Sequence, residues 1–196
     1  MKEEKLEEIL KNHRDWVTGN GGCLADLSDA YLSDANLSGA DLRCANLRCA
    51  DLLDADLRCA DLRCADLRCA DLRRANLSGA NLSDANLSNA DLPNFQICPE
   101  VGSFQAFKKT TKGIIRIEIP EDAKRTSSLV GRKCRAEYVK VIDGDGVGGK
   151  SLNYGSLTYE NGAIVKADKY DDDIRVECTH GVHFFMTKKE AMEWQK

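Results

Sequence analysis

Between residues 25 and 94, the apolar positions of the chain recur with a period of five. Alanine stands two residues before each leucine, from Ala25 to Ala90. A period of five matches neither the 3.6 residues of a helical turn nor the two residues of a flat strand, so the chain must turn a corner in every unit. We expect the leucines to form the inward core, with the alanines as small inward residues at the corners. The leucines are Leu27, Leu32, Leu37, Leu42, Leu47, Leu52, Leu57, Leu62, Leu67, Leu72, Leu77, Leu82, Leu87 and Leu92.

These fourteen units of the form Ala-(Asp/Asn)-Leu-x-x resemble the pentapeptide-repeat family. The resemblance implies a right-handed quadrilateral β-helix with four units per coil, and so twenty residues per coil. The residue before each leucine is Asp or Asn except at Tyr31. Together with the arginines that follow the leucines of the middle units, these residues predict mixed Asp/Arg ladders on the middle coils. A degenerate fifteenth unit is expected over Phe95–Pro99, with Ile97 pointing inward. The residue after leucine is arginine in the middle units, at Arg43, Arg48, Arg58, Arg63, Arg68 and Arg73.

The N-terminal segment predicts an amphipathic helix over residues 2–17. Leu6, Ile9, Leu10, His13 and Val17 fall on one face at three- and four-residue spacing, and Trp16 extends that face. The glycines of 18–22 then end the helix. The end of a β-helix exposes unpaired strand edges, so we expect this helix to cover the first coil.

The composition changes after Ser103 and predicts a small α+β domain. Strands are expected over Lys112–Ile119, Arg135–Ile142, Ile174–Cys178 and Val182–Met186. A hairpin is expected from Ser156–Tyr159 and Ala163–Ala167 around an Asn-Gly turn. Thr187 and Glu190 predict a capping box for a closing helix. The fold class is therefore mainly β, with a capping helix over 1–22, the repeat over 23–99 and the α+β domain over 100–196.

Phrases of the second half resemble an uncharacterised domain that follows pentapeptide repeats in bacterial and phage-encoded proteins. They are Ile119–Arg125, Gly131–Arg135 and Cys178–Phe185, followed by Glu-Ala-Met-Glu-Trp194. The resemblance implies no activity.

Charge and cysteine content limit the partners. The formal charge is −4, and residues 23–95 carry seven Arg and twelve Asp, so no part is basic enough to predict direct nucleic-acid binding. No apolar segment predicts a signal peptide or a membrane span, so we expect a cytoplasmic protein with nine reduced cysteines.

Five cysteines fill the last position of a unit, either as a redox or metal ladder or because a small residue fits there and near-identical units were duplicated. They are Cys44, Cys49, Cys59, Cys64 and Cys69.

Two motifs in the second half could carry chemistry. Gly144–Ser151 matches the phosphate-loop pattern G-x-x-x-x-G-K-[ST], but the residues after Lys150 are poor helix formers, so we expect a glycine-rich hairpin loop. Asp143 and Asp145 resemble the start of a calcium loop that no glutamate closes. No cofactor is predicted.

Four residues are weak candidates for a zinc site, and one of them, Cys178, is a weak candidate for a nucleophile with a neighbouring histidine as its base. Strand alternation would place His183 on the side opposite Cys178 and His180 unless the chain turns at Gly181. We therefore predict no metal or catalytic residue. The weak candidates are Cys134, Cys178, His180 and His183.

The sequence favours a non-enzymatic interaction or scaffold protein that presents a C-terminal module to a protein partner. One alternative is a DNA mimic acting on a DNA-binding enzyme such as a type II topoisomerase, as in several relatives of the repeat. The arginines of the middle coils oppose this alternative because they neutralise the acidic field. A small nucleotide- or Cys/His-dependent enzyme in the second half is the other alternative.

Overall fold

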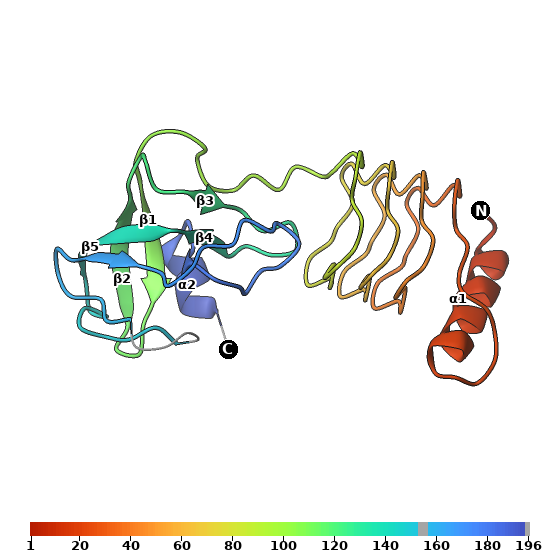
Figure 1. The fold of residues 1–196 in the computed structure, drawn as a ribbon, viewed down its shortest axis with the longest axis horizontal. Coiled ribbons are helices and arrows are strands. Elements are labelled where there is room, and N and C mark those ends of the chain that lie inside the picture. The colour runs from red at the N-terminus through yellow and green to blue at the C-terminus, as the bar shows by residue number, and fades with distance from the viewer. Residues whose placement is uncertain (153–156, 195–196) are drawn as a thin grey trace. The chain divides into compact units, whose positions relative to one another are not determined.

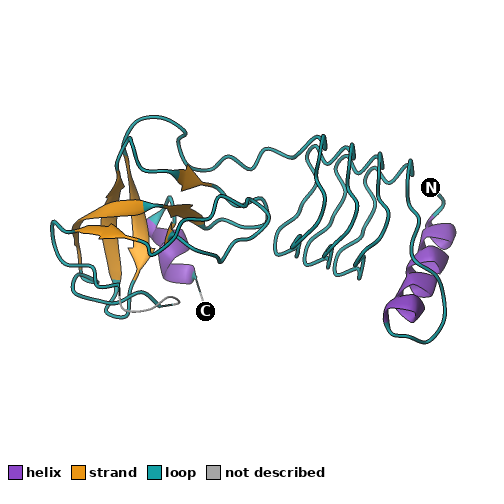
Figure 2. Cartoon of the chain, in the orientation of Figure 1, coloured by secondary structure: helices purple, strands orange, loops and turns teal. Residues whose placement is uncertain are grey.

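The computed structural model describes residues 1–152 and 157–194 and divides into two compact units. The first contains residues 1–95 and 129–131, and the second contains 96–128 and the described chain from 132 onward. The fold is mainly β with an N-terminal helix, as the sequence predicts. Figure 2 shows the named strands in the second unit, while the repeat is drawn as loops.

The N-terminal helix α1 spans Glu3–Val17. Its first turn carries Glu3 and Glu4, which favour the positive end of the helix dipole. Leu6 and His13 are buried, whereas Trp16 is 43% exposed and stacks on the His13 ring. The backbone N–H of Ala25 donates to His13 Nδ1 at 3.1 Å, which holds the helix against the first coil. Figure 1 shows α1 beside this coil.

The repeat pairs each unit with the unit twenty residues later. Parallel bridges begin with Asp26 and Asn46 and end with Asp71 and Asp91. The N–H of Asp61, for example, donates to Ala40 O at 2.9 Å. Each unit turns after a single bridged residue, so these pairs remain isolated bridges rather than named strands. The coils are visible in Figure 1 between α1 and the start of the second unit's chain.

The leucines lie inside these coils. All leucines of the repeat from Leu27 to Leu82 are buried, except that Leu53, which follows Leu52 out of register, is partly exposed. Leu87 and Leu92, in the last two units, are only half-buried. The leucine core is therefore more completely shielded from solvent in the middle coils than in the last two units.

The last position of each unit before the fourteenth has a left-handed backbone. Its φ lies between +54° and +73° from Asp29 to Asn89, whether the residue is Asp, Cys, Arg, Asn or Gly. The next N–H closes a turn back to the leucine, as from Ala45 to Leu42 O at 3.1 Å. A four-residue turn with positive φ at its third residue favours Gly and Asn. The residue at this position must therefore adopt a left-handed backbone conformation. A small side chain alone does not explain which residues occur there.

The predicted fifteenth unit is wrong. Ile97 packs against the core of the second unit, and its N–H donates to Ser127 Oγ at 2.9 Å. Phe95 stands where every earlier unit has alanine, and its ring is too large for that inward corner.

A segment from later in the sequence takes the place of the missing coil. From Asp29 to Cys69, the amide of the last position donates to the next coil, as from Cys59 to Ser78 O. The corresponding amide of Gly79 donates instead to Val130 O at 2.7 Å. Leu129 and Val130 are both buried in the first unit. Residues 129–131 thus pair with the final coil, which the sequence did not indicate.

The second unit contains two antiparallel sheets and a short helix. Phe107, in a strand of the first sheet, forms a bridge with Phe185, which directly follows a strand of the second sheet. Ala106, Ile117, Val141 and Phe184 belong to the shared core. The first sheet has the order β1 (Phe104–Lys109), β2 (Ile114–Ile119), β5 (Tyr138–Gly144), β6 (Ile164–Lys166). The second has the order β3 (Arg125–Thr126), β4 (Cys134–Ala136), β7 (Val182–Phe184), followed in sequence by α2 (Lys188–Glu193).

Several predicted elements of this unit differ from the structure. The expected strand Arg135–Ile142 is divided between β4 and β5, which lie in different sheets. The expected strand Ile174–Cys178 consists of turns, because Asp171 and Asp173 each accept the backbone N–H two residues on.

The hairpin prediction is also wrong, although its turn at Gly162 is present with φ +73°. β6 pairs with β5, and Thr158 forms a bridge with Lys150. Ser156, the predicted start of the hairpin, lies outside the described residues. The capping box of α2 is confirmed: Thr187 Oγ1 accepts the N–H of Glu190, and Glu190 Oε2 accepts the N–H of Thr187.

Candidate functional site

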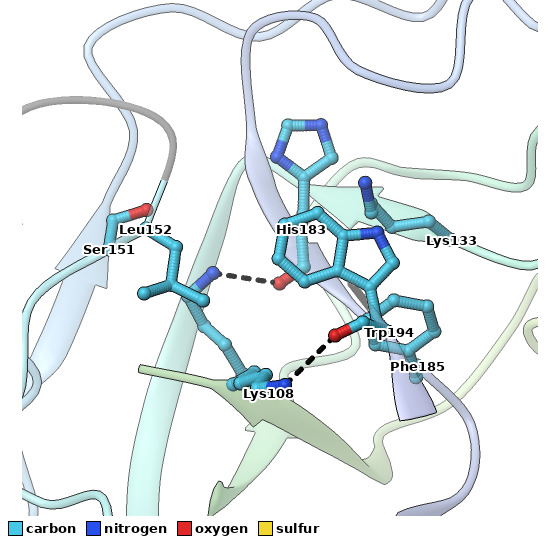
Figure 3. Close-up of a pocket in the computed structure, with 8 residues that line it drawn as sticks. Lys108, Lys133, Ser151, Leu152, His183, Phe185 and Trp194 are labelled. Atoms are coloured by element: carbon cyan, nitrogen blue, oxygen red, sulfur yellow. Dashed lines mark hydrogen bonds between the residues drawn. The ribbon is translucent and has the colours of Figure 1, made fainter. Parts of the chain in front are cut away.

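A small basic hollow in the second unit is the best-defined candidate site (Figure 3). Its volume is about 20 Å³, which corresponds to little more than one water-sized group. The lining comes from β1, from β7 and the residue after it, from the residue before β4, from the segment after the glycine-rich loop and from the end of α2. It consists of Lys108, Lys109, Lys133, Ser151, Leu152, His183, Phe185 and Trp194.

Lys108 reaches the interior because it alternates with Ala106 on the inner face of β1. Its side chain is nearly enclosed, with 6% exposure, and its Nζ donates to His183 O at 3.0 Å. The ammonium also lies 5.1 Å from the centre of the Tyr159 ring. Burial, reinforced by the charge of Lys133, lowers the pKa of Lys108 to about 8.

Lys133 enters the hollow from the residue before β4 and is 2% exposed. Its Nζ lies 4.2 Å from the centre of the Trp194 ring and donates to Cys178 Sγ at 2.8 Å. Lys109 has a fastening role: its Nζ donates to the carbonyl oxygens of Met192 and Trp194 and so holds the end of α2.

Positive charge predominates around this hollow. Within residues 1–152 and 157–194, neither Lys108, Lys109 nor Lys133 forms an ion pair with a carboxylate. The fully buried Arg135 lies opposite His183 on the paired strands β4 and β7. Burial, with Lys108 and Lys133 adding to it, lowers the pKa of His183 to about 3, so its imidazole is neutral at neutral pH. The sequence analysis did not identify Lys108 or Lys133 as site residues. The alternation of Lys108 with the inward Ala106 was the signal that could have placed the Lys108 side chain in the interior.

The four weak metal candidates do not converge. Cys134 is buried beside Ser127, while Cys178 is exposed beside Lys133. His180 Nδ1 lies 3.5 Å from an Asp168 carboxylate oxygen. In the described chain, no group of three or more His, Cys, Asp or Glu side chains is arranged to hold a metal ion. A hydrogen bond with Cys98, together with burial, raises the pKa of the Cys134 thiol.

The glycine-rich loop uses its own amides. Every backbone N–H from Gly146 to Ser151 donates to a protein acceptor; Gly148 bonds to Tyr159 O at 2.7 Å, and Lys150 bonds to Thr111 Oγ1 at 2.9 Å. No helix begins in the described residues that follow directly, up to Leu152. A phosphate-binding loop needs free converging amides and a helix N-terminus, and this loop offers neither.

The coil surface is covered by short-range ion pairs. Arg58, Arg63, Arg68 and Arg73 each pair with the Asp two residues earlier, at 2.5–2.6 Å. Hydrogen bonds from the arginines lower the pKa of the paired aspartates. These four arginines are therefore each matched within their own unit, whereas Arg74 pairs with Asp54 of the neighbouring coil.

The stacked five-residue units define a repeat protein, and comparison with known families assigns it. Residues 25–63 and 55–94 match the family described as pentapeptide repeats, and residues 94–191 match a family of unknown function, DUF5758. The chain belongs to the pentapeptide-repeat proteins, and its second half belongs to DUF5758. Pentapeptide-repeat proteins are generally interaction or scaffold proteins and generally non-enzymatic.

Solved structures of other pentapeptide repeat proteins are similar to part of the chain. One from the cyanobacterium Cyanothece 51142 (Rfr23) is 38% identical over 35% of this chain and 50% of its own, with a TM-score of 0.30. One from the Arabidopsis thaliana thylakoid lumen is 34% identical over 38% of this chain and 64% of its own, with a TM-score of 0.21. HetL from Nostoc sp. strain PCC 7120, involved in heterocyst differentiation regulation, is 38% identical over 34% and 38%, with a TM-score of 0.19.

This chain thus covers half the length of the Cyanothece protein and less than two thirds of the other two. A search of curated proteins found no match. Among the described helices, neither has the length and apolar character needed to cross a bilayer.

Proposed function

We propose that this protein is a non-enzymatic interaction protein that acts by binding a protein partner. In this proposal, residues 23–94 form a right-handed quadrilateral β-helix, residues 1–22 cap it, and the second unit is the partner-binding module. The observation that carries the proposal is the unbroken series of parallel bridges at twenty-residue spacing, from Asp26 to Asp91. Such a stack is a rigid framework whose stability approximates a sum of coil–coil interfaces.

The leucine core and the paired surface charges support a framework role. From Leu27 to Leu82, the leucines that follow the bridged residues are buried, and Arg63 and Arg68 each pair with an aspartate of their own unit. A surface with its charges matched in this way attracts neither nucleic acid nor acidic membranes strongly. We therefore place the partner among proteins and assign recognition to the second unit.

The cysteines support a cytoplasmic location within the same proposal. Seven of the nine are exposed and all are free thiols, which suits a compartment that keeps cysteines reduced. The buried pair is Cys98 and Cys134.

Affinity capture with the intact chain tests this proposal. The intact chain is needed because residues 129–131 belong to the first unit. The test variant is Ile164→Asp, at a 69% exposed position on the edge strand β6. The matched control is Arg63→Ser on a coil. We expect the wild type and the control to retain the same partner, and we expect the complex to form again from purified components. The Ile164→Asp variant should bind this partner less tightly.

The opposite outcomes would contradict the proposal. If Arg63→Ser removed the partner and Ile164→Asp did not, recognition would lie on the coils. Turnover of a small molecule by the purified chain, without any partner, would replace the interaction role with an enzymatic one.

A further inference from the structure

Cysteines in the last position of a unit stack on one another in successive coils. Cys44 and Cys64 belong to units whose residues Asp41 and Asp61 form a parallel bridge. Their φ values are +60° and +58°, so the two residues have the same local backbone geometry. The N–H of Cys44 donates at 2.8 Å to the carbonyl oxygen of Arg63, the residue directly before Cys64. Cys44 and Cys64 therefore lie side by side at one corner of the repeat.

Cys49 and Cys69 repeat this arrangement at the next corner. Their units are joined by the parallel bridge between Asn46 and Asp66, and the N–H of Cys49 donates to Arg68 O at 2.8 Å. The φ values of the two cysteines are +55° and +59°. All four cysteines are exposed free thiols. We call the two pairs, Cys44–Cys64 and Cys49–Cys69, the corner dithiols.

The two sulfur atoms of a corner dithiol can reach the same small ligand. The spacing between coils at this position is seen at Cys59, because a Cβ at Gly79, one coil further on, would lie 3.3 Å from Cys59 Sγ. The Cys44 and Cys64 thiols are joined by a hydrogen bond. Burial, together with the Cys64 thiol, raises the pKa of Cys44. One ion placed between such neighbours can contact both sulfurs.

The number of thiolates determines which ion would fit. Thiolate ligands select soft ions, among them Cu(I), Zn²⁺ and the iron of iron–sulfur clusters. Structural Zn²⁺ sites and iron–sulfur clusters take four protein ligands. Over residues 1–152 and 157–194, no three His, Cys, Asp or Glu side chains are arranged around one point. Cu(I) is stable with two thiolate ligands, so it is the soft ion that a pair of cysteines satisfies.

The stacking geometry favours an ion between the sulfurs over a disulfide. Paired residues of neighbouring parallel strands are about 4.7–4.9 Å apart, and equivalent side chains that point the same way keep this spacing at their Cβ atoms. A disulfide requires Cβ atoms about 3.5–4.5 Å apart. Direct bonding of the two sulfurs would therefore draw the coils together, whereas a bridging ion fills the gap.

We propose that each corner dithiol binds one Cu(I) ion through its two thiolates. Binding replaces two S–H bonds with two S–Cu bonds and releases two protons. Copper remains Cu(I), so no oxidant or reductant takes part. Arginine stands directly before each of the four cysteines, and a cation beside a thiol favours the thiolate. This inference goes beyond the proposed interaction role and does not rest on it.

Competition with the Cu(I) chelator bicinchoninate tests the proposal. The intact, reduced chain is titrated with Cu(I) under anaerobic conditions, and the absorbance of the copper–bicinchoninate complex reports the copper that the protein does not hold. We expect the wild type to hold one Cu(I) for each corner dithiol against the chelator. X-ray absorption of the loaded protein should show two sulfur neighbours for each copper. Zn²⁺ at equal concentration should not displace the copper.

Serine variants localise the copper. Cys64→Ser should bind its equivalent at least about tenfold more weakly, because loss of a ligand costs no less than loss of a group that supports one. Cys69→Ser should weaken the other equivalent, and the combined variant should weaken both. Cys59→Ser is the matched control and should change neither, because Gly39 and Gly79 occupy the same position in the coils on both sides. Thermal unfolding of each variant shows whether it is folded.

Several results would overturn the proposal. Copper retained undiminished by the combined variant would lie elsewhere in the chain. Equal losses in Cys59→Ser and Cys64→Ser would show that the number of thiols, and not their stacking, determines binding. Four sulfur neighbours around copper in the wild type, or Zn²⁺ held as tightly as Cu(I), would exclude a site made of two thiolates.

Discussion

Leu62 and Arg63 are neighbours in sequence but face opposite environments. Leu62 is fully buried, whereas the Arg63 side chain is 46% exposed and pairs with Asp61. Leu62→Ala should lower the free energy of unfolding by about 2–5 kcal/mol, because it leaves a cavity that neighbouring coils cannot fill. Arg63→Ser should lower it far less, since a surface ion pair contributes little. Denaturant unfolding measures both, and equal losses would refute the inward and outward assignment.

The left-handed position of each unit yields a second test at the residue scale. Cys64 has φ +58°, a conformation that disfavours residues with a Cβ by about 1–2 kcal/mol. Cys64→Gly relieves that strain but increases the freedom of the unfolded chain, so the net change should stay within about 1 kcal/mol. Cys64→Val should be clearly destabilising, because a β-branched residue fits this region poorly. Glycine and valine variants that unfold together would contradict this account.

His183 predicts a pH dependence for the second unit. Its folded pKa of about 3 lies below the ordinary value of 6.5, so its contribution to stability is complete above about pH 6.5 and declines as the pH falls. Between pH 7 and pH 5 the loss should be about 2 kcal/mol. Unfolding followed by Trp194 fluorescence should show this loss in the wild type and a smaller one in His183→Gln. The same pH slope in both would show that His183 titrates normally.

At the scale of elements, the sequence predicts those structural features that depend on a pattern of residues close together in the chain. The five-residue period predicts the leucine core, and the Thr187–Glu190 spacing predicts the cap of α2, because each depends on residues only a few positions apart. The turns of 171–178 were missed because their aspartates bond to local amides, which outweighs the apolar alternation of Ile174 and Val176. Lys108 was missed as a site residue because its significance depends on Lys133, which directly precedes a strand of the other sheet.

The glycine-rich loop carries a prediction of its own. Since the amides of the loop already donate within the protein, Lys150 offers a ligand only an exposed ammonium. Magnesium-dependent binding of ATP or GTP at this loop is therefore not expected, and Lys150→Ala should change no ligand affinity. Calorimetry with each nucleotide and magnesium measures this, with Lys112→Ala as the control. Micromolar binding that disappears in Lys150→Ala would make the loop a nucleotide site.

At the scale of the whole molecule, the paired coil charges decide the question of DNA mimicry. Arg58, Arg63 and Arg68 neutralise the aspartates of the middle units, so no continuous acidic stripe remains there. We expect no inhibition of DNA gyrase by micromolar protein at physiological salt in a supercoiling assay. Salt-sensitive inhibition that weakens in Asp26→Asn or Asp91→Asn, in units without arginine, would reverse this conclusion.

The segment 129–131 gives the chain an unusual route. The chain passes from one unit to the other after Phe95, after Ser128 and after Gly131, so three covalent connections join the two units. A single recombination crossover between residues 95 and 96 would transfer the repeat without the segment that pairs with Gly79. Its last coil would then be left with an unpaired edge, open to pairing with other chains. The repeat and the second unit are therefore expected to be inherited together, and a graft of either must carry all three junctions.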